Sequence, residues 1–127
     1  MNWFEAEEYC EKLGGFLASI HSEKEMNKIA VGQSLSSKSS TFWIGLNRIN
    51  SSTFKWNDKS TFKFNKWKNG EPNNLNRHEM CTKIQSNGLW VDNSCFVVGG
   101  WICKLKKGVI PPSTQIIVEE LFPGNKM

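Results

Sequence analysis

The sequence predicts a single α+β domain in which two helices pack on small antiparallel sheets. The order of its patterns is the first observation, because helical periodicity comes first and short strand-like runs follow. Its length is the second, since 127 residues suit one domain, and six tryptophans and eight phenylalanines supply apolar mass for a core. The third is the set of four widely spaced cysteines, an even number that favours disulfides.

A first helix is predicted over residues 2–13, because apolar residues recur there at helical spacing and acidic residues occupy the opposite face. Asn2 is a favourable N-cap, and Gly14-Gly15 provides a stop. A short apolar strand is predicted next, from Phe16 to Ile20. The apolar face of the helix consists of Trp3, Ala6, Cys10 and Leu13.

A second helix is predicted to begin at a capping box. The Ser22 side chain can accept from the backbone amide of Glu25, and the Glu25 side chain can bond back. We expect this helix to run to about Gln33, and the serine-rich residues 34–40 to form a loop.

Strand signals begin at Thr41. Residues 42–46 form a continuous apolar run that is typical of a buried strand. Residues 53–56 and 62–64 flank a polar turn and predict a hairpin, whereas residues 65–80 are polar and irregular and predict a long functional loop. Three further short strands are predicted at Thr82–Gln85, Leu89–Val91 and Gly100–Lys104.

The character of the chain changes after the last predicted strand. Pro111-Pro112 interrupts any regular element, and an apolar triplet at residues 116–118 stands alone. We therefore interpret residues 1–104 as the domain and residues 105–127 as a linker or tail. The alternative is an extra strand over residues 116–121.

The cysteine pattern indicates an oxidising compartment. No Cys-x-x-Cys pair is present, and His21 and His78 show no zinc-site spacing relative to the cysteines. Disulfides are the better interpretation. Asn50 begins an Asn-Ser-Ser glycosylation acceptor, which agrees with an extracellular or cell-surface location. Three pairings are open among Cys10, Cys81, Cys95 and Cys103.

The chain carries no signal-peptide pattern and no apolar run long enough to cross a membrane, so we expect no membrane insertion by this segment. The residues after Met1 already resemble the middle of a domain. We expect a fragment of a larger extracellular protein, a variant that lacks its first strand, or a segment excised for expression.

Nucleic-acid binding and catalysis are not supported by the sequence. The net charge of +4 comes from scattered basic residues, without a basic stripe interleaved with aromatic residues. We interpret the cluster Lys104, Lys106 and Lys107 as a solvated linker end, with a phosphate or anionic-glycan contact as the alternative. No nucleophile accompanies a base and an orienting acid, so we expect no enzyme.

The segment between Trp67 and Cys95 concentrates side chains that end in carboxylate or amide oxygen. Hard cations such as Ca²⁺ are bound by six to eight oxygens of this kind. The segment therefore predicts a cation site on a disulfide-anchored loop. Its candidate ligands are Glu71, Asn73, Glu79 and Asp92.

These motifs, in this order, resemble the C-type lectin-like domain over about residues 1–104. The resemblance is to the short form of the fold, and it implies the disulfides Cys10–Cys103 and Cys81–Cys95. The sequence departs from the family pattern at its N-terminus, where we expect the family's first strand to be absent. We therefore expect one unpaired sheet edge. The matching motifs are Trp3-x-x-Ala6-x-x-x-Cys10, Gly14-Gly15-x-Leu17-Ala18-x-Ile20, Phe42-Trp43-Ile44-Gly45-Leu46, Trp56-Asn57-Asp58, Trp67 to Asn74, Glu79-Met80-Cys81, Trp90-Val91-Asp92-x-x-Cys95 and Trp101-Ile102-Cys103-Lys104.

The resemblance also implies the roles of the oxygen donors. In the family a Ca²⁺ ion bridges the protein and two vicinal sugar hydroxyls, and the Glu-Pro-Asn order is mannose-type. Here that order is Glu71-Pro72-Asn73, so Pro72 is expected to be cis. The implied metal and carbohydrate ligands are Glu71, Asn73, Glu79 and Asp92.

One position departs from the family pattern. Val91 stands where the family's Trp-Asn-Asp triplet carries asparagine, and valine supplies no oxygen. Trp56-Asn57-Asp58 spells that triplet elsewhere, but we interpret it as a structural turn. We therefore expect a Ca²⁺ site that is weakened or lost.

The predicted function is a carbohydrate-recognition module with mannose-type specificity, acting through a weak Ca²⁺ site. The alternative is a Ca²⁺-independent protein-binding module of a cell-surface receptor or a secreted glycoprotein. A structural spacer domain in a multi-domain receptor is a third interpretation.

Overall fold

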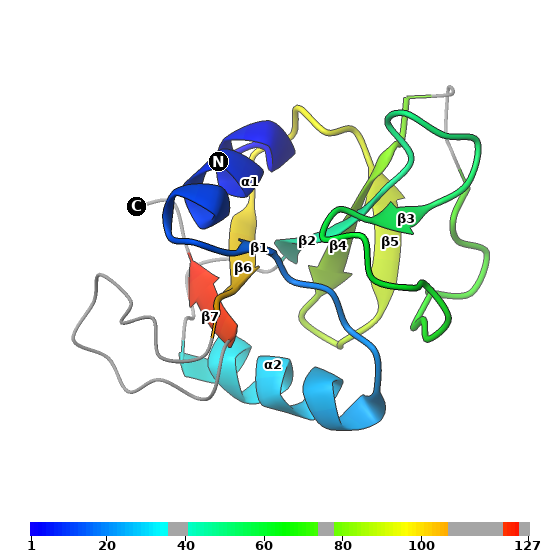
Figure 1. Ribbon diagram of the computed structural model, residues 1–127. Helices are drawn as coiled ribbons and strands as arrows, with labels where there is room; N and C mark the ends of the chain where they lie inside the picture. Colours follow the sequence, from blue (N-terminus) through cyan, green and yellow to red (C-terminus); the bar gives the residue numbers. More distant parts are fainter. Residues whose placement is uncertain (36–40, 74–77, 107–120, 125–127) are drawn as a thin grey trace.

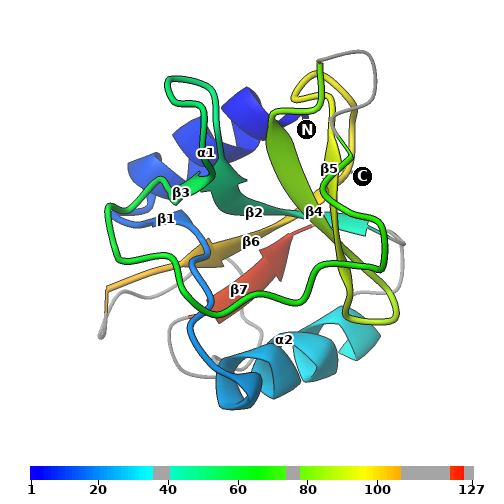
Figure 2. The ribbon, with the colours of Figure 1, turned by 90° about the vertical axis from the view of Figure 1, so that its right-hand side faces the viewer.

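The computed structural model describes residues 1–35, 41–73, 78–106 and 121–124. A seven-stranded sheet lies between two helices, which occupy opposite sides of it (Figures 1 and 2). The predicted α+β class is confirmed. In chain order the elements are α1 (Trp3–Lys12), β1 (Phe16–Leu17), α2 (Glu23–Leu35), β2 (Thr41–Asn47), β3 (Lys55–Trp56), β4 (Cys81–Gln85), β5 (Trp90–Asn93), β6 (Gly100–Lys104) and β7 (Leu121–Gly124).

Helix α1 has the boundaries and caps that its sequence predicts. The Asn2 side chain accepts from the Glu5 amide and the Glu5 carboxylate accepts from the Asn2 amide, which is a complete capping box. Beyond its last turn, Gly14 adopts a φ of 89°, a conformation that glycine adopts without strain. The predicted apolar residues Trp3, Ala6 and Cys10 are buried.

Helix α2 begins as predicted and ends later. The Ser22 hydroxyl accepts from the Glu25 amide, but the Glu25 carboxylate accepts from the amide of His21, one residue earlier than a standard capping box requires. The helix extends to Leu35, and residues 36–40 of the predicted loop lie outside the described residues. Neither helix in the described part of the chain has the length and apolar character needed to span a bilayer.

The sheet has the strand order β1-β6-β2-β4-β5, with β3 on β2 and β7 on β6. Most pairs are antiparallel, but β2 and β6 run parallel, so the sheet is mixed where we expected antiparallel sheets. The hairpin β4–β5 comes between β2 and β6 in the sequence. After this hairpin the chain comes back beside β2, and β6 runs parallel to it. The predicted strands of this region are correct to within three residues.

The predicted hairpin between residues 53–56 and 62–64 is wrong. Lys55 and Trp56 form β3, which pairs with β2, and residues 62–64 form no strand. The apolar residues in this segment fill the core instead of alternating across a ladder. The rings of Phe62 and Phe64 pack edge-on against Trp56 and Trp90, at centroid distances of 6.0 and 6.1 Å.

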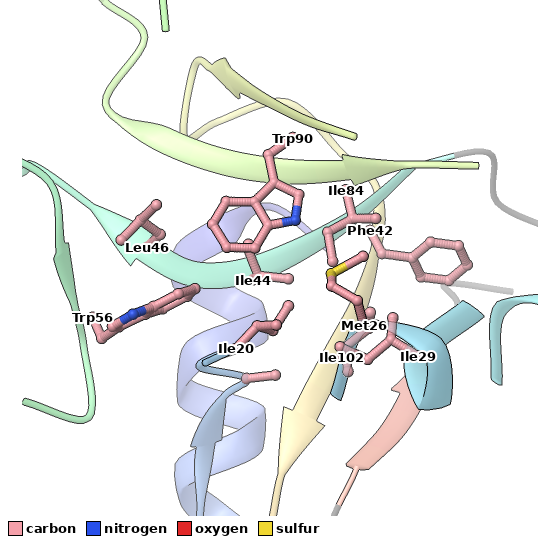
Figure 3. Close-up of a cluster of buried hydrophobic side chains, with 11 residues drawn as sticks. Ile20, Met26, Ile29, Phe42, Ile44, Leu46, Trp56, Ile84, Trp90 and Ile102 are labelled. Atoms are coloured by element: carbon pink, nitrogen blue, oxygen red, sulfur yellow. The ribbon is translucent and has the colours of Figure 1, made fainter. Parts of the chain in front are cut away.

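The core consists of two clusters of buried side chains. The larger cluster joins α2 to the sheet: Met26 and Ile29 of the helix meet the strand residues Ile84 and Ile102 (Figure 3). Trp90 lies fully buried in this cluster and contacts three other aromatic rings. The second cluster, beneath α1, contains Trp3, Ala6, Cys10, Leu17, Trp43, Cys81, Cys95, Trp101, Cys103 and Leu105.

Both implied disulfides are present. Cys10–Cys103 connects α1 to β6 across 93 residues, and Cys81–Cys95 closes 14 residues around the β4–β5 hairpin. In the chain-entropy model, the first disulfide stabilises the fold by roughly 4 to 5 kcal/mol and the second by about 3 kcal/mol.

The segment that we assigned to a linker or tail contributes a strand. Lys104 pairs with Phe16 of β1 and also with Leu121 of β7, so β1 and β7 lie on opposite edges of β6. The sheet edge that we expected to be unpaired is therefore covered. The alternative strand at residues 116–121 falls outside the described residues, except for Leu121.

A truncation tests whether β7 belongs to the domain, as we propose. Removing residues 107–127 leaves the β6 backbone groups on that edge without partners, so we expect the melting temperature to fall by about 5 °C or more. Removing residues 125–127 alone retains β7 and is the matched control. Equal melting temperatures for the two truncated chains, measured by circular dichroism, would leave β7 without a structural role.

Glu7 is a buried carboxyl in the middle of the fold, only 5% exposed. It accepts from the Leu17 amide at 3.2 and 3.3 Å and from the Asn57 side-chain amide at 2.7 Å. Burial raises the pKa of Glu7 to about 7, against the lowering effect of these hydrogen bonds. Glu7 therefore joins α1, β1 and the turn after β3.

The raised pKa of Glu7 predicts that stability falls as the pH rises from about 4.5 to about 7, because the unfolded chain loses this proton first. We expect Glu7→Gln to reduce that pH dependence by up to about 3 kcal/mol, since one pKa unit corresponds to about 1.4 kcal/mol. Urea unfolding at pH 4.5 and pH 8 measures the change in the free energy of unfolding between the two pH values. The exposed Glu8→Gln is the control, and equal pH dependence in both variants would contradict the assignment.

Candidate functional site

The irregular segment after residue 64 is fixed to β5 by backbone hydrogen bonds. The Trp90 amide donates to the Lys66 carbonyl and the Lys68 amide donates to the Trp90 carbonyl, each at 2.8 Å. A turn follows, in which the Glu71 amide donates to the Lys68 carbonyl. The Glu71–Pro72 peptide bond is cis, as the resemblance implied. The oxygen-bearing residues that follow this turn are thereby brought alongside β5.

Three of the four candidate ligands lie together. The Asn73 backbone amide donates to Asp92 Oδ1 at 3.1 Å, and its side-chain amide donates to Glu71 Oε1 at 2.8 Å. Asp92 comes from β5 and is only 2% exposed, whereas Asn73 is exposed. We call Glu71, Asn73 and Asp92 the oxygen cluster. It presents one buried carboxylate and two groups closer to the surface.

The two carboxyl groups of the oxygen cluster face each other. Glu71 Oε2 is buried and has no hydrogen-bond donor among the described residues. Burial, together with the neighbouring Asp92 carboxylate, raises the pKa of Glu71 to about 7. Two facing carboxylates are stable only with a proton or a cation between them. The oxygen cluster therefore brings together two carboxyl groups that either a proton or a cation would stabilise.

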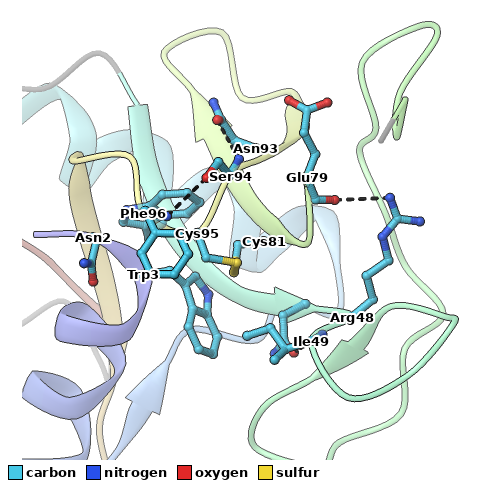
Figure 4. The surroundings of a disulfide bond; sticks show 12 residues. Asn2, Trp3, Arg48, Ile49, Glu79, Cys81, Asn93, Ser94, Cys95 and Phe96 are labelled. Carbon is cyan, nitrogen blue, oxygen red and sulfur yellow. Dashed lines mark hydrogen bonds between the residues drawn. A yellow bond between two sulfur atoms is a disulfide. The ribbon is translucent and has the colours of Figure 1, made fainter. Parts of the chain in front are cut away.

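Glu79 takes a different position from the other candidate ligands. Its backbone carbonyl accepts from Arg48 Nη2 at 3.1 Å, and its carboxylate extends away from Arg48 (Figure 4). The same Arg48 nitrogen lies 3.6 Å from Asp92 Oδ2. Within the described residues, no group of three or more histidine, cysteine, aspartate or glutamate side chains is close enough to hold a metal ion. Glu71 and Asp92 thus meet, while the Glu79 carboxylate does not complete a third acidic ligand.

Val91 lies in β5 between Trp90 and Asp92 and pairs with Lys83 of β4. Its side chain is half-buried and contains no oxygen. Asn93 does not replace it, because its Oδ1 accepts from the Ser94 amide at 2.7 Å. The side chains of the oxygen cluster are carboxylates and an amide, which are ligand types that Ca²⁺ prefers.

The structural interpretation of Asn57 and Asp58 is supported by their contacts. Asn57 donates to Glu7, and Asp58 accepts from Ser60 and from the Ser19 hydroxyl. Both side chains are thus used to hold the turn after β3. Sequence reasoning, in contrast, missed Arg48, because an arginine after a buried strand carries no motif that points to a distant carboxylate.

Asn50, the predicted glycosylation acceptor, is exposed in the turn after β2, where a glycan could be attached.

The chain matches a known protein family. A family model for the lectin C-type domain matches residues 1–105, which is most of the chain. The low affinity immunoglobulin epsilon Fc receptor of Mus musculus is 36% identical over 104 residues, covering 80% of this chain and 30% of that receptor. The chain therefore spans less than a third of that relative.

Solved structures show the same fold. The cow C-type carbohydrate-recognition domain of CD23, determined in the presence of GlcNAc2Man3 oligosaccharide, has a TM-score of 0.72 and 31% identity, covering 81% of this chain and 78% of that chain. A calcium-independent type II antifreeze protein has a TM-score of 0.70 and 27% identity, covering 81% and 77%.

The facing carboxylates predict the effect of Glu71→Gln. A glutamine can accept from Asn73 and donate to Asp92, so we expect about 1 kcal/mol of added stability at pH 8 in the presence of chelator. Urea unfolding measures this gain. Glu23→Gln removes an exposed carboxylate that pairs with Lys66, and we expect it to have no stabilising effect. A loss of stability in Glu71→Gln would show that the two carboxylates do not repel each other.

Proposed function

The chain belongs to the C-type lectin domain family, and we propose that it recognises carbohydrate of the mannose type through a weak Ca²⁺ site. Members of this family are generally binding modules and not enzymes. The facing carboxyl groups of Glu71 and Asp92 are the observation that carries the proposal, because a cation bound between them would replace the proton that otherwise reduces their repulsion.

Each residue of the proposed site has a defined task. Glu71 and Asp92 would hold the cation with their carboxylates, and Asn73 would add its amide oxygen. The Glu79 carboxylate, which does not group with Glu71 and Asp92 in the structure, would have to turn toward them to become a further ligand. When bound, Ca²⁺ would supply coordination positions for two vicinal hydroxyls of a sugar, and the same side chains would hydrogen-bond those hydroxyls.

The proposed specificity rests on the order Glu71-Pro72-Asn73, which is the mannose-type order in the family. The similarity to the cow CD23 domain supports it, since that domain was determined in the presence of an oligosaccharide that contains mannose. Val91 supplies no oxygen, and we expect its presence to reduce Ca²⁺ affinity at least tenfold, which is about 1.4 kcal/mol.

A Ca²⁺-independent protein-binding module is the second candidate. Val91 favours it, and so does Arg48, which already provides a positive charge beside Asp92. The similarity to a calcium-independent antifreeze protein supports the idea that this fold persists without the ion. In this case the loop face around residues 65–73 would contact a protein partner.

We propose an extracellular or cell-surface location. The two disulfides and the exposed glycosylation acceptor Asn50 support it. The relatives that match the chain include receptors and lectins, which agrees with a recognition role.

The two candidates are separated by calorimetric titration with Ca²⁺ and by retention on a mannan column with and without chelator. Saturable Ca²⁺ binding and chelator-sensitive retention support the carbohydrate proposal. An absence of both favours protein recognition.

The weakness of the site is tested by Val91→Asn, which restores an oxygen beside Asp92. We expect at least tenfold tighter Ca²⁺ binding and stronger retention on mannan. Val98→Asn makes the same chemical change at an exposed valine outside the site, and we expect it to leave both measurements unchanged. If Val91→Asn binds Ca²⁺ no better than Val98→Asn, residue 91 is not a ligand position.

A further inference from the structure

Arg48 lies immediately after β2 and contacts two residues of the proposed site, Asp92 and Glu79. Its Nη2 atom is 3.6 Å from Asp92 Oδ2 and donates to the Glu79 carbonyl at 3.1 Å. Its guanidinium carbon lies 4.8 Å from the centre of the Phe54 ring. The Arg48 side chain is 18% exposed, and that of Asp92 is fully buried. A fixed positive charge is therefore held among the predicted ligands by three different kinds of contact.

We propose that Arg48 is an internal counter-cation of the oxygen cluster, which holds Asp92 in place without Ca²⁺ and lowers the affinity of the site for Ca²⁺. This inference rests on the proposed function, because it concerns the same site. It assigns to Arg48 a positioning role.

The charge of Asp92 supplies the first argument. A buried carboxylate is strongly destabilising unless a cation or several donors compensate it. Asp92 accepts the Asn73 amide on Oδ1, while Oδ2 faces the guanidinium. The loop residue Asn73 thus bonds to a carboxylate that Arg48 already neutralises, so the loop can keep its place on β5 before any metal ion binds.

Electrostatics supplies the second argument. A divalent ion bound by Glu71 and Asp92 would share the Asp92 carboxylate with a guanidinium group 3.6 Å from it. Like charges at such short range repel strongly in a partly buried site, and each unit charge changes binding by roughly an order of magnitude or more. Arg48 therefore opposes the ion while it stabilises the empty arrangement.

The Glu79 carbonyl supplies the third argument. Arg48 holds this carbonyl on its own side, and the Glu79 carboxylate extends in the opposite direction (Figure 4). The backbone amide of Arg48 also donates to the Met80 carbonyl at 2.9 Å. Arg48 therefore fixes the backbone of one predicted ligand as well as the side chain of another.

The test compares Arg48→Gln with the wild-type chain. Glutamine removes the charge but retains a donor for the Glu79 carbonyl, so it separates charge from backbone support. Lys63→Gln makes the same change in net charge at an exposed lysine and is the matched control. Arg48→Lys keeps the charge without the planar fork.

Two measurements are made on each variant. Terbium emission sensitised by the nearby tryptophans, with Ca²⁺ as competitor, gives the affinity for a hard cation. Thermal unfolding in chelator and in saturating Ca²⁺ gives the stability of the loop arrangement with and without the ion.

We expect Arg48→Gln to bind Ca²⁺ at least tenfold more tightly than the wild type, and to melt about 5 °C lower in chelator but not in saturating Ca²⁺. Arg48→Lys should stay within threefold of wild-type affinity, and Lys63→Gln should match the wild type in both measurements. If Arg48→Gln binds Ca²⁺ no more tightly than the wild type, the proposal is overturned. The same holds if neither protein binds Ca²⁺. Equal destabilisation with and without Ca²⁺ would also overturn it, because Arg48 would then be purely structural.

The proposed function and this inference fail independently. If the wild type does not bind mannan but Arg48→Gln binds Ca²⁺ more tightly than the wild type, the proposed function is contradicted and the Arg48 inference is supported. Ca²⁺-dependent mannan binding by the wild type, with unchanged affinity in Arg48→Gln, does the reverse.

Discussion

The pair of backbone hydrogen bonds between Trp90 and residues 66 and 68 is the constraint on which the candidate site depends. An irregular loop has many conformations, and fixing its first residues to a strand removes most of this freedom. Trp90 is fully buried among aromatic rings, so the strand that receives the loop is anchored in the core. Asp92 is two residues further along the same strand. The core therefore positions the chemistry, through one strand that belongs to both.

Buried charge is handled in two different ways in this fold. Glu7 accepts hydrogen bonds from neutral amides of Leu17 and Asn57, but burial outweighs their effect and raises its pKa to about 7. Asp92 is compensated by the Asn73 amide and a cation, Arg48. The hydrogen bonds of Glu7 join α1, β1 and the turn after β3 without a bound ion, which suits a purely structural role. The arrangement at Asp92 leaves one oxygen of Glu71 without a donor among the described residues, and this oxygen is part of the cation site that we propose.

Local patterns predicted local structure well. The capping residue Asn2 and the glycine after α1 were correctly placed, because they act within one turn of the helix. The prediction of a hairpin at residues 53–64 was wrong, because Phe62 and Phe64 pack against Trp56 and Trp90 in the core and do not pair with a neighbouring strand. Strand β7 was assigned to a tail because its pairing with β6 depends on an edge that the sequence does not reveal.

The sequence alone determined the resemblance to the family, through the order of its motifs, and the oxygen-bearing residues of the loop. The resemblance implied which cysteines pair, and the structure contains both disulfides. Tertiary structure decided which of these oxygens meet. It brought Glu71 and Asn73 to Asp92, turned the Glu79 carbonyl toward Arg48, and placed a guanidinium beside a buried carboxylate. The physical reason is that an electrostatic contact depends on the distance between two groups in space. Residues that are far apart in the sequence come within contact distance only when the core packs.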